Sequence, residues 1–340
     1  MSDQSRFVEI RHAQKSFGTL EVLKDISLTV ERGQIVGIIG SSGSGKSTLL
    51  RAINDLDPLT GGEIWLDGVQ VNKKLPHRQY EKHINEMRQH VGMVFQHFKL
   101  VENFTVLENI ILGAEDGAML NSSLGNARKE LKHLAEEYGL NVDPDEVIEN
   151  LSVGHQQRVE ILKTLYRKTE ILILDEPTGV LTPAEADQLF RILDRLREEG
   201  KTIILITHKL REIMEATDTV SVMRRGQMTA TVKTSETNPE HLAELMVGRK
   251  VLLQVDKIPA KPGKPVLEIE KLRVVDEAGV ERVKGIDLTV RAGEILGIAG
   301  VAGNGQSELL EVLGGMREGT GTIRVNGEPL PLAGVGSDAR

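Results

Sequence analysis

Cysteine is absent from the 340-residue sequence, and aromatic residues make up only 3% of it. The first absence excludes disulfides, thiolate metal sites and cysteine nucleophiles. The scarcity of aromatics means that the core has to be aliphatic. No apolar run approaches the roughly 18 residues needed to span a bilayer, and residues 1–15 lack the apolar stretch of a signal peptide. If the protein works at a membrane, we expect other chains to provide the spanning helices.

The charge of the chain gives no reason to expect a nucleic-acid partner. The formal net charge is −8, whereas DNA- and RNA-binding domains are usually basic. Hydrophobic residues at 39% and charged residues at 27% are typical of a globular protein. A length of 340 residues exceeds one ordinary domain, so we expect two units.

An internal repeat supports this division. Residues 21–40 read EVLKDISLTVERGQIVGIIG, and residues 281–300 read ERVKGIDLTVRAGEILGIAG. More than half of the aligned positions are identical. We therefore predict a complete unit over 1–250, a linker over 251–266 and the start of a second copy over 267–340. The linker contains three prolines, which favour an extended connector. The second copy looks truncated, because it lacks counterparts of what ends the first.

Short apolar runs alternate with helical patterns in the first unit. Such alternation predicts an α/β fold with a mostly parallel sheet flanked by helices. The predicted strands cover 28–30, 35–39, 171–174, 202–206 and 219–223. The predicted helices cover 46–53, 156–166, 183–198 and 210–216. We interpret 106–151 as a mostly helical insert and its tract 116–125 as a polar surface loop.

A phosphate-binding loop is predicted between the strand at 35–39 and the helix at 46–53. The segment fits G-x-x-x-x-G-K-[ST] in the required strand–loop–helix context. Its residues are Gly40, Ser41, Ser42, Gly43, Ser44, Gly45, Lys46, Ser47 and Thr48. Glycines let backbone amides wrap the phosphates, and the helix start directs its positive dipole end toward them. Lys46 would meet the β- and γ-phosphates, and the Ser47 hydroxyl would bind Mg²⁺.

Two carboxylates follow the apolar run 171–174. Asp175 would hold Mg²⁺, through water, and Glu176 would act as the general base that polarises the attacking water. The alternative is a strand that ends in a solvated acidic turn. The lysine-containing loop elsewhere in the chain favours the catalytic interpretation.

LSVGHQQRVEI at 151–161 resembles the signature of the ATP-binding cassette (ABC) family of P-loop NTPases. The signature residues are Leu151, Ser152, Val153, Gly154, His155 and Gln156. Val153 and His155 replace the usual Gly and Gln. In that family the signature closes on the γ-phosphate held by a partner cassette. A capped helix start is the structural alternative. The resemblance implies an antiparallel β part and a helical signature subdomain, here at about 106–165.

Three further positions match the family pattern. Gln96 occupies the Q-loop and would sense Mg²⁺ and the nucleophile, and His208 would contact the γ-phosphate. Phe17 stands where the family places an aromatic residue that stacks on adenine, although a core phenylalanine is the alternative. Without the resemblance, His208 would be an ordinary strand-end histidine. Thr182 stands where many relatives have Asp, which puts the usual contacts of that Asp between cassettes in doubt.

The second copy carries an altered phosphate loop. Its matching positions are Gly300, Gly303, Gly305, Gln306 and Ser307. Gln306 stands where Lys46 stands in the first copy, so the loop keeps a hydrogen-bond donor but loses the charge that strengthens bonds to phosphate. We expect weaker nucleotide binding or poor turnover there.

The resemblance implies an ATP-hydrolysing, Mg²⁺-dependent subunit of an importer at the cytoplasmic face of the cell membrane. The expected partners are membrane permease subunits, a second cassette and, indirectly, a periplasmic or lipoprotein substrate-binding protein. The segments from 151 on, including GVAGNGQSEL at 300–309, resemble ATPases of nucleoside and simple-sugar importers, which carry two cassettes in one chain. Residues 40–68 resemble polar amino-acid importers, which is the first alternative. A soluble twin-cassette ATPase acting on ribosomes or DNA is the second, and a nucleotide-binding scaffold without turnover the third.

Overall fold

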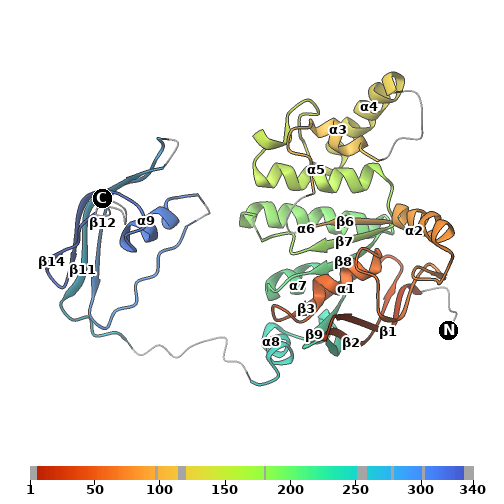
Figure 1. Cartoon of the computed structure of the whole chain (residues 1–340), viewed down its shortest axis with the longest axis horizontal. Coiled ribbons are helices and arrows are strands. Elements are labelled where there is room, and N and C mark those ends of the chain that lie inside the picture. The colour runs from red at the N-terminus through yellow and green to blue at the C-terminus, as the bar shows by residue number, and fades with distance from the viewer. Residues whose placement is uncertain are drawn as a thin grey trace. The chain divides into compact units, whose positions relative to one another are not determined.

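The computed structural model describes residues 6–95, 99–113, 120–179, 181–250, 259–276, 279–300 and 303–332. Gln96 lies outside these ranges. The chain divides into two compact units, Met1–Leu253 and Gln254–Arg340 (Figure 1). The division falls inside the predicted linker, and each unit is described by itself.

A six-stranded sheet forms the centre of the first unit. Its strand order is β10-β9-β3-β8-β7-β6, and every neighbouring pair is parallel except β10 with β9. The strands are β3 (Ile35–Gly40), β6 (Val91–Val94), β7 (Ile171–Asp175), β8 (Thr202–Ile206), β9 (Thr219–Arg224) and β10 (Gln227–Lys233). All residues of β3, β7 and β8 are buried, as expected for parallel strands covered on both faces. All five predicted strands are present, although the one predicted over 28–30 is part of a longer strand, Leu20–Glu31.

Helices cover both faces of this sheet (Figure 1). On one face, α1 packs together with the antiparallel sheet described below, and on the other lie α5 and α6, with α7 and α8 beside them. Their bounds are α1 (Lys46–Ile53), α2 (His77–His90), α5 (Val153–Tyr166), α6 (Pro183–Glu198), α7 (Leu210–Ala216) and α8 (Pro239–Val247). The predicted helices 46–53, 183–198 and 210–216 are confirmed.

A smaller antiparallel sheet, in the order β2-β1-β4-β5, packs against α1. Its strands are β1 (Arg6–Phe17), β2 (Leu20–Glu31), β4 (Gly61–Leu66) and β5 (Val69–Gln70). Buried and exposed residues alternate along β2, which is the pattern of a sheet with one face on the core. This sheet is the antiparallel part that the family resemblance implies.

The insert is helical, as predicted, but its expected surface loop is partly wrong. It contains α3 (Val106–Ile111), α4 (Leu120–Tyr138) and the 3₁₀ turn η2 (Ile148–Asn150). The predicted loop 116–125 overlaps α4 over 120–125, and 116–119 lie outside the described residues. Asn, Ser and Gly favour a loop there, but Ala127, Leu131 and Ala135 recur at helical spacing and are buried. Packing of this face overrides the weak local preference.

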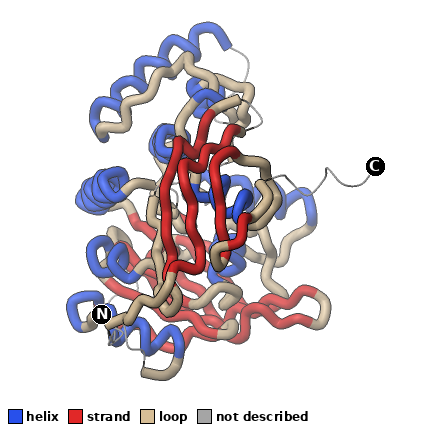
Figure 2. Tube along the Cα trace, turned by 90° about the vertical axis from the view of Figure 1, so that its left-hand side faces the viewer, coloured by secondary structure: helices blue, strands red, loops and turns tan. Residues whose placement is uncertain are grey.

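The second unit repeats the antiparallel part of the first. Its sheet has the order β12-β11-β13-β14, and the pair Leu267–Val325 matches Val8–Leu66. The elements are β11 (Pro265–Val275), β12 (Glu281–Arg291), β13 (Thr320–Val325), β14 (Glu328–Pro329) and α9 (Gln306–Leu313) (Figure 2, where strands are red). The sequence repeat is therefore also a repeat of structure.

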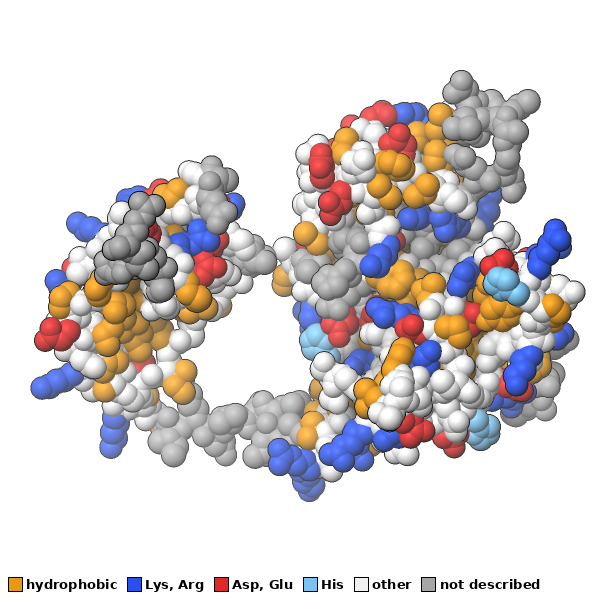
Figure 3. Space-filling model, in the orientation of Figure 1, with side chains coloured by type: hydrophobic (Ala, Val, Ile, Leu, Met, Phe, Trp, Pro, Cys, Tyr) orange, Lys and Arg blue, Asp and Glu red, His pale blue; other side chains and the backbone are white. Residues whose placement is uncertain are grey.

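One apolar segment of the second unit differs from its counterpart. Residues 295–300 correspond to β3 but form no strand among the described residues. Ile295 is 95% exposed and Ile298 is 49% exposed, whereas β3 is buried between β8 and β9. Figure 3 shows exposed hydrophobic side chains on this unit. The same apolar pattern gives a strand only where neighbouring strands complete its hydrogen bonds. Within the described ranges, no helix is both long and apolar enough to cross a bilayer.

We predict that Leu131→Ala lowers the free energy of unfolding by about 2–5 kcal/mol, because Leu131 is only 1% exposed and its loss leaves a cavity. Denaturant unfolding followed by circular dichroism measures the change. Lys132→Ala on the solvent side of α4 should change the free energy of unfolding by less than about 0.5 kcal/mol. Equal effects of the two substitutions would contradict the packing of α4.

Candidate functional site

The loop between β3 and α1 needs glycine at two positions. A Cβ atom on Gly40 would lie 2.1 Å from the carbonyl oxygen of Met223, on the neighbouring strand. Gly45 precedes α1 with a left-handed φ of 100°, and a Cβ there would lie 2.9 Å from Leu23 Cδ2. The backbone can therefore follow this path only without these side chains. Ser41, Ser42 and Gly43, by contrast, are exposed.

Lys46 is folded over its own loop. Its Nζ donates hydrogen bonds to the carbonyl oxygens of Gly40 at 2.9 Å and Ser41 at 3.0 Å, and lies 3.5 Å from Ser44 Oγ. The residue is 7% exposed, and this burial lowers the pKa of its ammonium group, against the attraction of Glu176 and Asp175. A desolvated cation at the base of an exposed loop is suited to an anionic ligand.

The first loop and the acidic strand end meet in space. Ser47 Oγ, in the first turn of α1, lies 3.4 Å from Asp175 Oδ1, at the end of β7. Burial raises the pKa of Asp175, and the hydrogen bond from Ser47 opposes this rise. These two oxygen-bearing side chains, separated by 128 residues, are thus held as neighbours by the sheet.

Glu176 and His208 also come together. The His208 Nδ1 atom lies 3.1 Å from Glu176 Oε1, and Glu176 N donates to the carbonyl oxygen of Ile206 at 2.8 Å. Glu176 has a φ of 48°, which is strained for a residue with a side chain. Strained backbone that is held by its surroundings is concentrated at functional sites. The site so far therefore joins the ends of three parallel strands, β3, β7 and β8.

The signature segment begins α5. Ser152 is its N-cap, so the helix starts at Val153, three residues before the predicted start at 156. The Ser152 Oγ atom lies 2.8 Å from His155 Nδ1 and accepts a hydrogen bond from the His155 backbone N–H at 3.4 Å. Leu151 is buried, Val153 is 45% exposed and Gln156 Nε2 donates to the carbonyl oxygens of Ile148 and Leu151. Capping by Ser152 is compatible with either interpretation of the segment.

Gly154 is packed against a neighbouring helix. A Cβ atom on it would lie 2.3 Å from Glu185 Oε1, in the first turn of α6. Glu185 forms a capping box with Thr182, whose side chain accepts from the Glu185 backbone while the Glu185 carboxylate accepts from Thr182 N. Thr182 thus has a structural role where many relatives have Asp. The pattern T-x-x-E at 182–185 is the sequence signal of this capping box.

The structure contradicts the core alternative for Phe17. This residue ends β1 and is 48% exposed. Lys15 Nζ lies 4.8 Å from the centre of its ring, in cation–π geometry. Lys15 is not among the predicted site residues. The one sequence signal for this contact is that Lys15 and Phe17 are two positions apart in one strand, which places both side chains on the same face.

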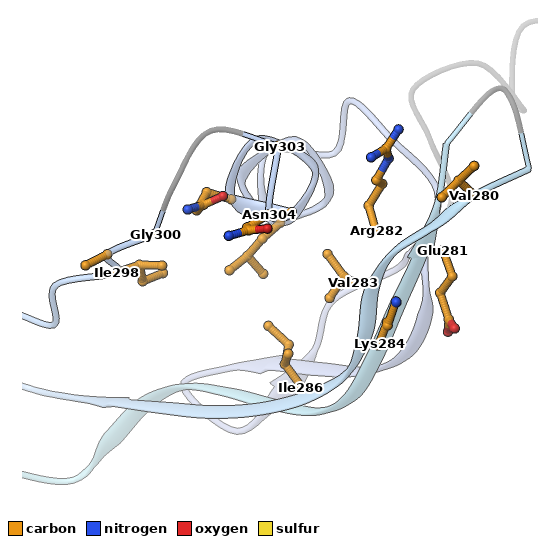
Figure 4. Close-up of a pocket in the computed structure, with 14 residues that line it drawn as sticks. Val280, Glu281, Arg282, Val283, Lys284, Ile286, Ile298, Gly300, Gly303 and Asn304 are labelled. Atoms are coloured by element: carbon orange, nitrogen blue, oxygen red, sulfur yellow. The ribbon is translucent and has the colours of Figure 1, made fainter. Parts of the chain in front are cut away.

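The altered loop of the second unit keeps the left-handed glycines of the first at two positions. Gly303 and Gly305 have φ values of 85° and 93°, and a Cβ on Gly305 would lie 2.6 Å from the carbonyl oxygen of Arg282. Gln306 begins α9, as Lys46 begins α1, and Ser307 follows it. A cavity of about 580 Å³ lies between this loop, which includes Gly300, and β12 (Figure 4).

Comparison with known proteins agrees with this geometry. Residues 23–179 match the family model described as ABC transporter. The chain is 44% identical over 324 residues to a nucleoside import ATP-binding protein, NupA, of Lactococcus lactis, covering 95% of this chain and 63% of that protein. The first unit is an ABC transporter ATP-binding cassette. The relation extends to a guanosine import ATP-binding protein, NupO, of Bacillus subtilis (45% identity, covering 95% of this chain and 62% of that protein).

A glucose import ATP-binding protein, TsgD13, of Haloferax volcanii is 41% identical, with 96% of this chain and 64% of that protein covered. The chain therefore spans less than two thirds of the length of these relatives. Among solved structures, cbiO1 from Clostridium perfringens matches the cassette with a TM-score of 0.61 and 26% identity, covering 70% of this chain and 93% of that chain. The dimeric bacterial cassette MJ0796 matches with a TM-score of 0.60 and 29% identity, covering 67% and 98%.

We predict that Asp175→Asn stabilises the ligand-free cassette at neutral pH. Because burial raises the pKa of Asp175 above its ordinary value of 3.8, the folded state binds this proton more tightly than the unfolded chain. The free energy of unfolding therefore falls as pH rises through the raised pKa, and the asparagine variant lacks that loss. Urea unfolding from pH 4 to pH 7.5 should give a difference between variant and wild type that grows with pH. A constant difference would contradict the burial of this charge.

Proposed function

We propose that the chain binds Mg-ATP at residues 40–48 and hydrolyses it as the energy-coupling subunit of an importer. The contact of Ser47 with Asp175 carries this proposal, since it unites a phosphate-binding loop with an acidic strand end. Lys46 lies at the base of the same loop, and Glu176 faces His208 beside it. A related cassette of 29% identity, with a TM-score of 0.58, has been solved with ADP and Pi bound.

The residues present fit a magnesium ion. Ser47 and Asp175 offer a hydroxyl and a carboxylate oxygen 3.4 Å apart, and Mg²⁺ prefers oxygen ligands while retaining several waters. Bound there, the ion would neutralise charge on the phosphates during phosphoryl transfer. Gln96 would complete the ligands by family resemblance. Ser47 and Asp175 would orient the nucleotide, and Lys46 would place positive charge beside its terminal phosphates.

Glu176 is the proposed general base. Its side chain is 23% exposed and would accept a proton from the attacking water, while His208, whose Nδ1 lies 3.1 Å from Glu176 Oε1, would contact the γ-phosphate. Phe17, exposed at the end of β1, would stack on adenine. The α5 start with Ser152 and Gly154 would close on a nucleotide held by another cassette, so turnover needs a second cassette.

Nucleosides or simple sugars are the proposed cargo. The relatives described above are named for nucleoside, guanosine and glucose import. Their names favour this class over polar amino acids. The partners would be membrane permease subunits, which provide the spanning helices, and a periplasmic or lipoprotein substrate-binding protein that acts indirectly. The chain would then lie at the cytoplasmic face of the membrane. The net charge of −8 disfavours the ribosome- or DNA-directed alternative.

We also propose that the second unit is the opening part of a second cassette. The matching sheet order, strand register and loop geometry support this. Two features of this unit would weaken its binding of nucleotide. In the loop, Gln306 replaces the lysine. At the end of β11, Asp276 follows Val275 where Phe17 follows Ser16 in the first unit. An acidic side chain cannot stack on adenine as an aromatic ring does.

The proposal predicts that Glu176→Gln lowers the ATP hydrolysis rate by about 10²–10⁴-fold, the usual contribution of a general base. Binding of Mg-ATP should remain within about threefold, because Lys46, Ser47 and Asp175 are untouched. Steady-state hydrolysis and isothermal titration calorimetry measure the two quantities. Glu170→Gln is the matched control, since Glu170 lies on the surface and pairs with Arg32. Continued turnover by Glu176→Gln would exclude its assigned role.

For the second loop, we predict that Gln306→Lys strengthens nucleotide binding by about tenfold, because a charge-assisted hydrogen bond to phosphate is roughly twice as strong as a neutral one. Lys46→Ala in the same protein silences the first loop, so that calorimetry reports the second. Gln306→Met keeps the chain length without a charge and serves as control. If lysine and methionine bind equally, the loss of charge is not what distinguishes the two loops.

A further inference from the structure

A buried carboxylate is hydrogen-bonded to the two loops that carry Glu176 and His208. Glu212, in the first turn of α7, is only 5% exposed. Its Oε2 accepts a hydrogen bond from Thr207 Oγ1 at 2.7 Å, and its Oε1 accepts one from Thr178 Oγ1. Lys209 Nζ lies 3.2 Å from the same Oε1. We call these four residues the Glu212 cluster.

The Glu212 cluster joins the loops that follow β7 and β8. Thr178 lies two residues after Glu176, and Thr207 lies immediately before His208. Lys209 Nζ also donates to the Thr178 carbonyl oxygen at 2.8 Å and to its Oγ1 at 3.1 Å. Lys209 N donates to Thr207 Oγ1 at 3.0 Å, which closes a ring of hydrogen bonds. Each loop therefore carries one member of the Glu176–His208 pair and one threonine bonded to Glu212.

The exposed pair cannot hold this geometry by itself. The His208 side chain is 58% exposed, and ion pairs open to solvent contribute little free energy. The Glu212 side chain is 6% exposed, so its charge-assisted hydrogen bonds act in a low-dielectric setting where they are strong and directional. The backbone strain at Glu176, with φ of 48°, also needs an outside restraint.

We propose that Glu212 is a positioning residue that fixes the His208 loop against the Glu176 loop. It acts through Thr178 and Thr207 and does not reach the nucleotide. The inference rests on the proposed ATPase function for its kinetic consequence, whereas the geometric part stands on the cluster itself. Glu212→Gln keeps the size of the side chain but replaces one acceptor oxygen with a donor and removes the charge paired with Lys209.

The kinetic test uses the full chain with Mg-ATP. Glu212→Gln should lower kcat about 10- to 100-fold, the loss that a misplacement of about 1 Å can cause. KM for ATP should change by less than about threefold, because residues 40–48 are not touched. Glu215→Gln, one turn further along α7 and paired with Arg211 at the surface, is the control and should retain the wild-type rate. A change in KM alone would overturn the inference.

A double-mutant comparison separates positioning from general damage. If Glu212 acts through His208, adding Glu212→Gln to His208→Ala causes no further loss of kcat beyond about twofold. If the double variant instead loses kcat by the product of the two single-variant factors, Glu212 acts independently of His208 and has a purely structural role. Should Glu212→Gln fail to fold, Thr178→Val removes one hydroxyl from the cluster at constant shape and should lower kcat about tenfold. Thr178→Ser restores the hydroxyl and should restore the rate, and equal rates for these two would overturn the inference.

A final measurement does not depend on turnover. The NMR signals of the His208 ring, assigned with His208→Ala, should move in Glu176→Gln, because the ring loses its carboxylate neighbour. Glu212→Gln should move the same signals in the same direction, and Glu215→Gln should leave them unchanged. Unmoved signals in Glu212→Gln would refute the positioning role. If the wild-type protein shows no ATPase activity but Glu212→Gln still moves the His208 signals, the proposed function is refuted and the positioning role is left intact.

Discussion

The parallel pairing of β3 with β8, and of β8 with β7, is the constraint on which the site depends. Parallel strands end at the same edge of a sheet, so residues far apart in the sequence are brought to one line. Ser47 and Asp175 meet across that edge at 3.4 Å, and His208 meets Glu176 at 3.1 Å. Neither contact contributes much free energy by itself. The buried aliphatic strands bring both pairs to this edge of the sheet, and the Glu212 cluster then holds the loop of His208 against the loop of Glu176.

Much of this arrangement was predictable because local patterns and global packing agree. The helices at 46–53 and 183–198 begin and end at the predicted residues, since a glycine turn starts one and a Thr–Pro cap starts the other. The loop itself followed from glycine, lysine and serine at fixed spacing. The loop prediction failed over 120–125, because packing overruled the local preference of this polar stretch. The stretch belongs to α4, whose later turns are apolar on one face and pack into the core.

The Glu212 cluster could not be predicted for a different reason. Its members come from three segments, and no short spacing marks a glutamate in α7 as the partner of Thr178, 34 residues earlier in the chain. The 295–300 segment gives the complementary lesson. Its sequence nearly repeats that of β3, yet it is exposed and forms no strand in the part of the second unit that the structure describes. A strand is a property of its neighbours as much as of its residues.

Because Lys46 is buried in the ligand-free protein, its ammonium group loses water when the chain folds and not when a ligand binds. Two of its three ammonium protons are already held by the carbonyl oxygens of Gly40 and Ser41, and its remaining contact, to Ser44 Oγ at 3.5 Å, is the longest. The chain pays for removing water from this charge when it folds, so an arriving phosphate displaces little water and freezes few rotamers. The free energy of unfolding of the ligand-free cassette is correspondingly lower than its packing alone would allow. The free energy of phosphate binding is more favourable by a similar amount, because binding no longer includes this desolvation.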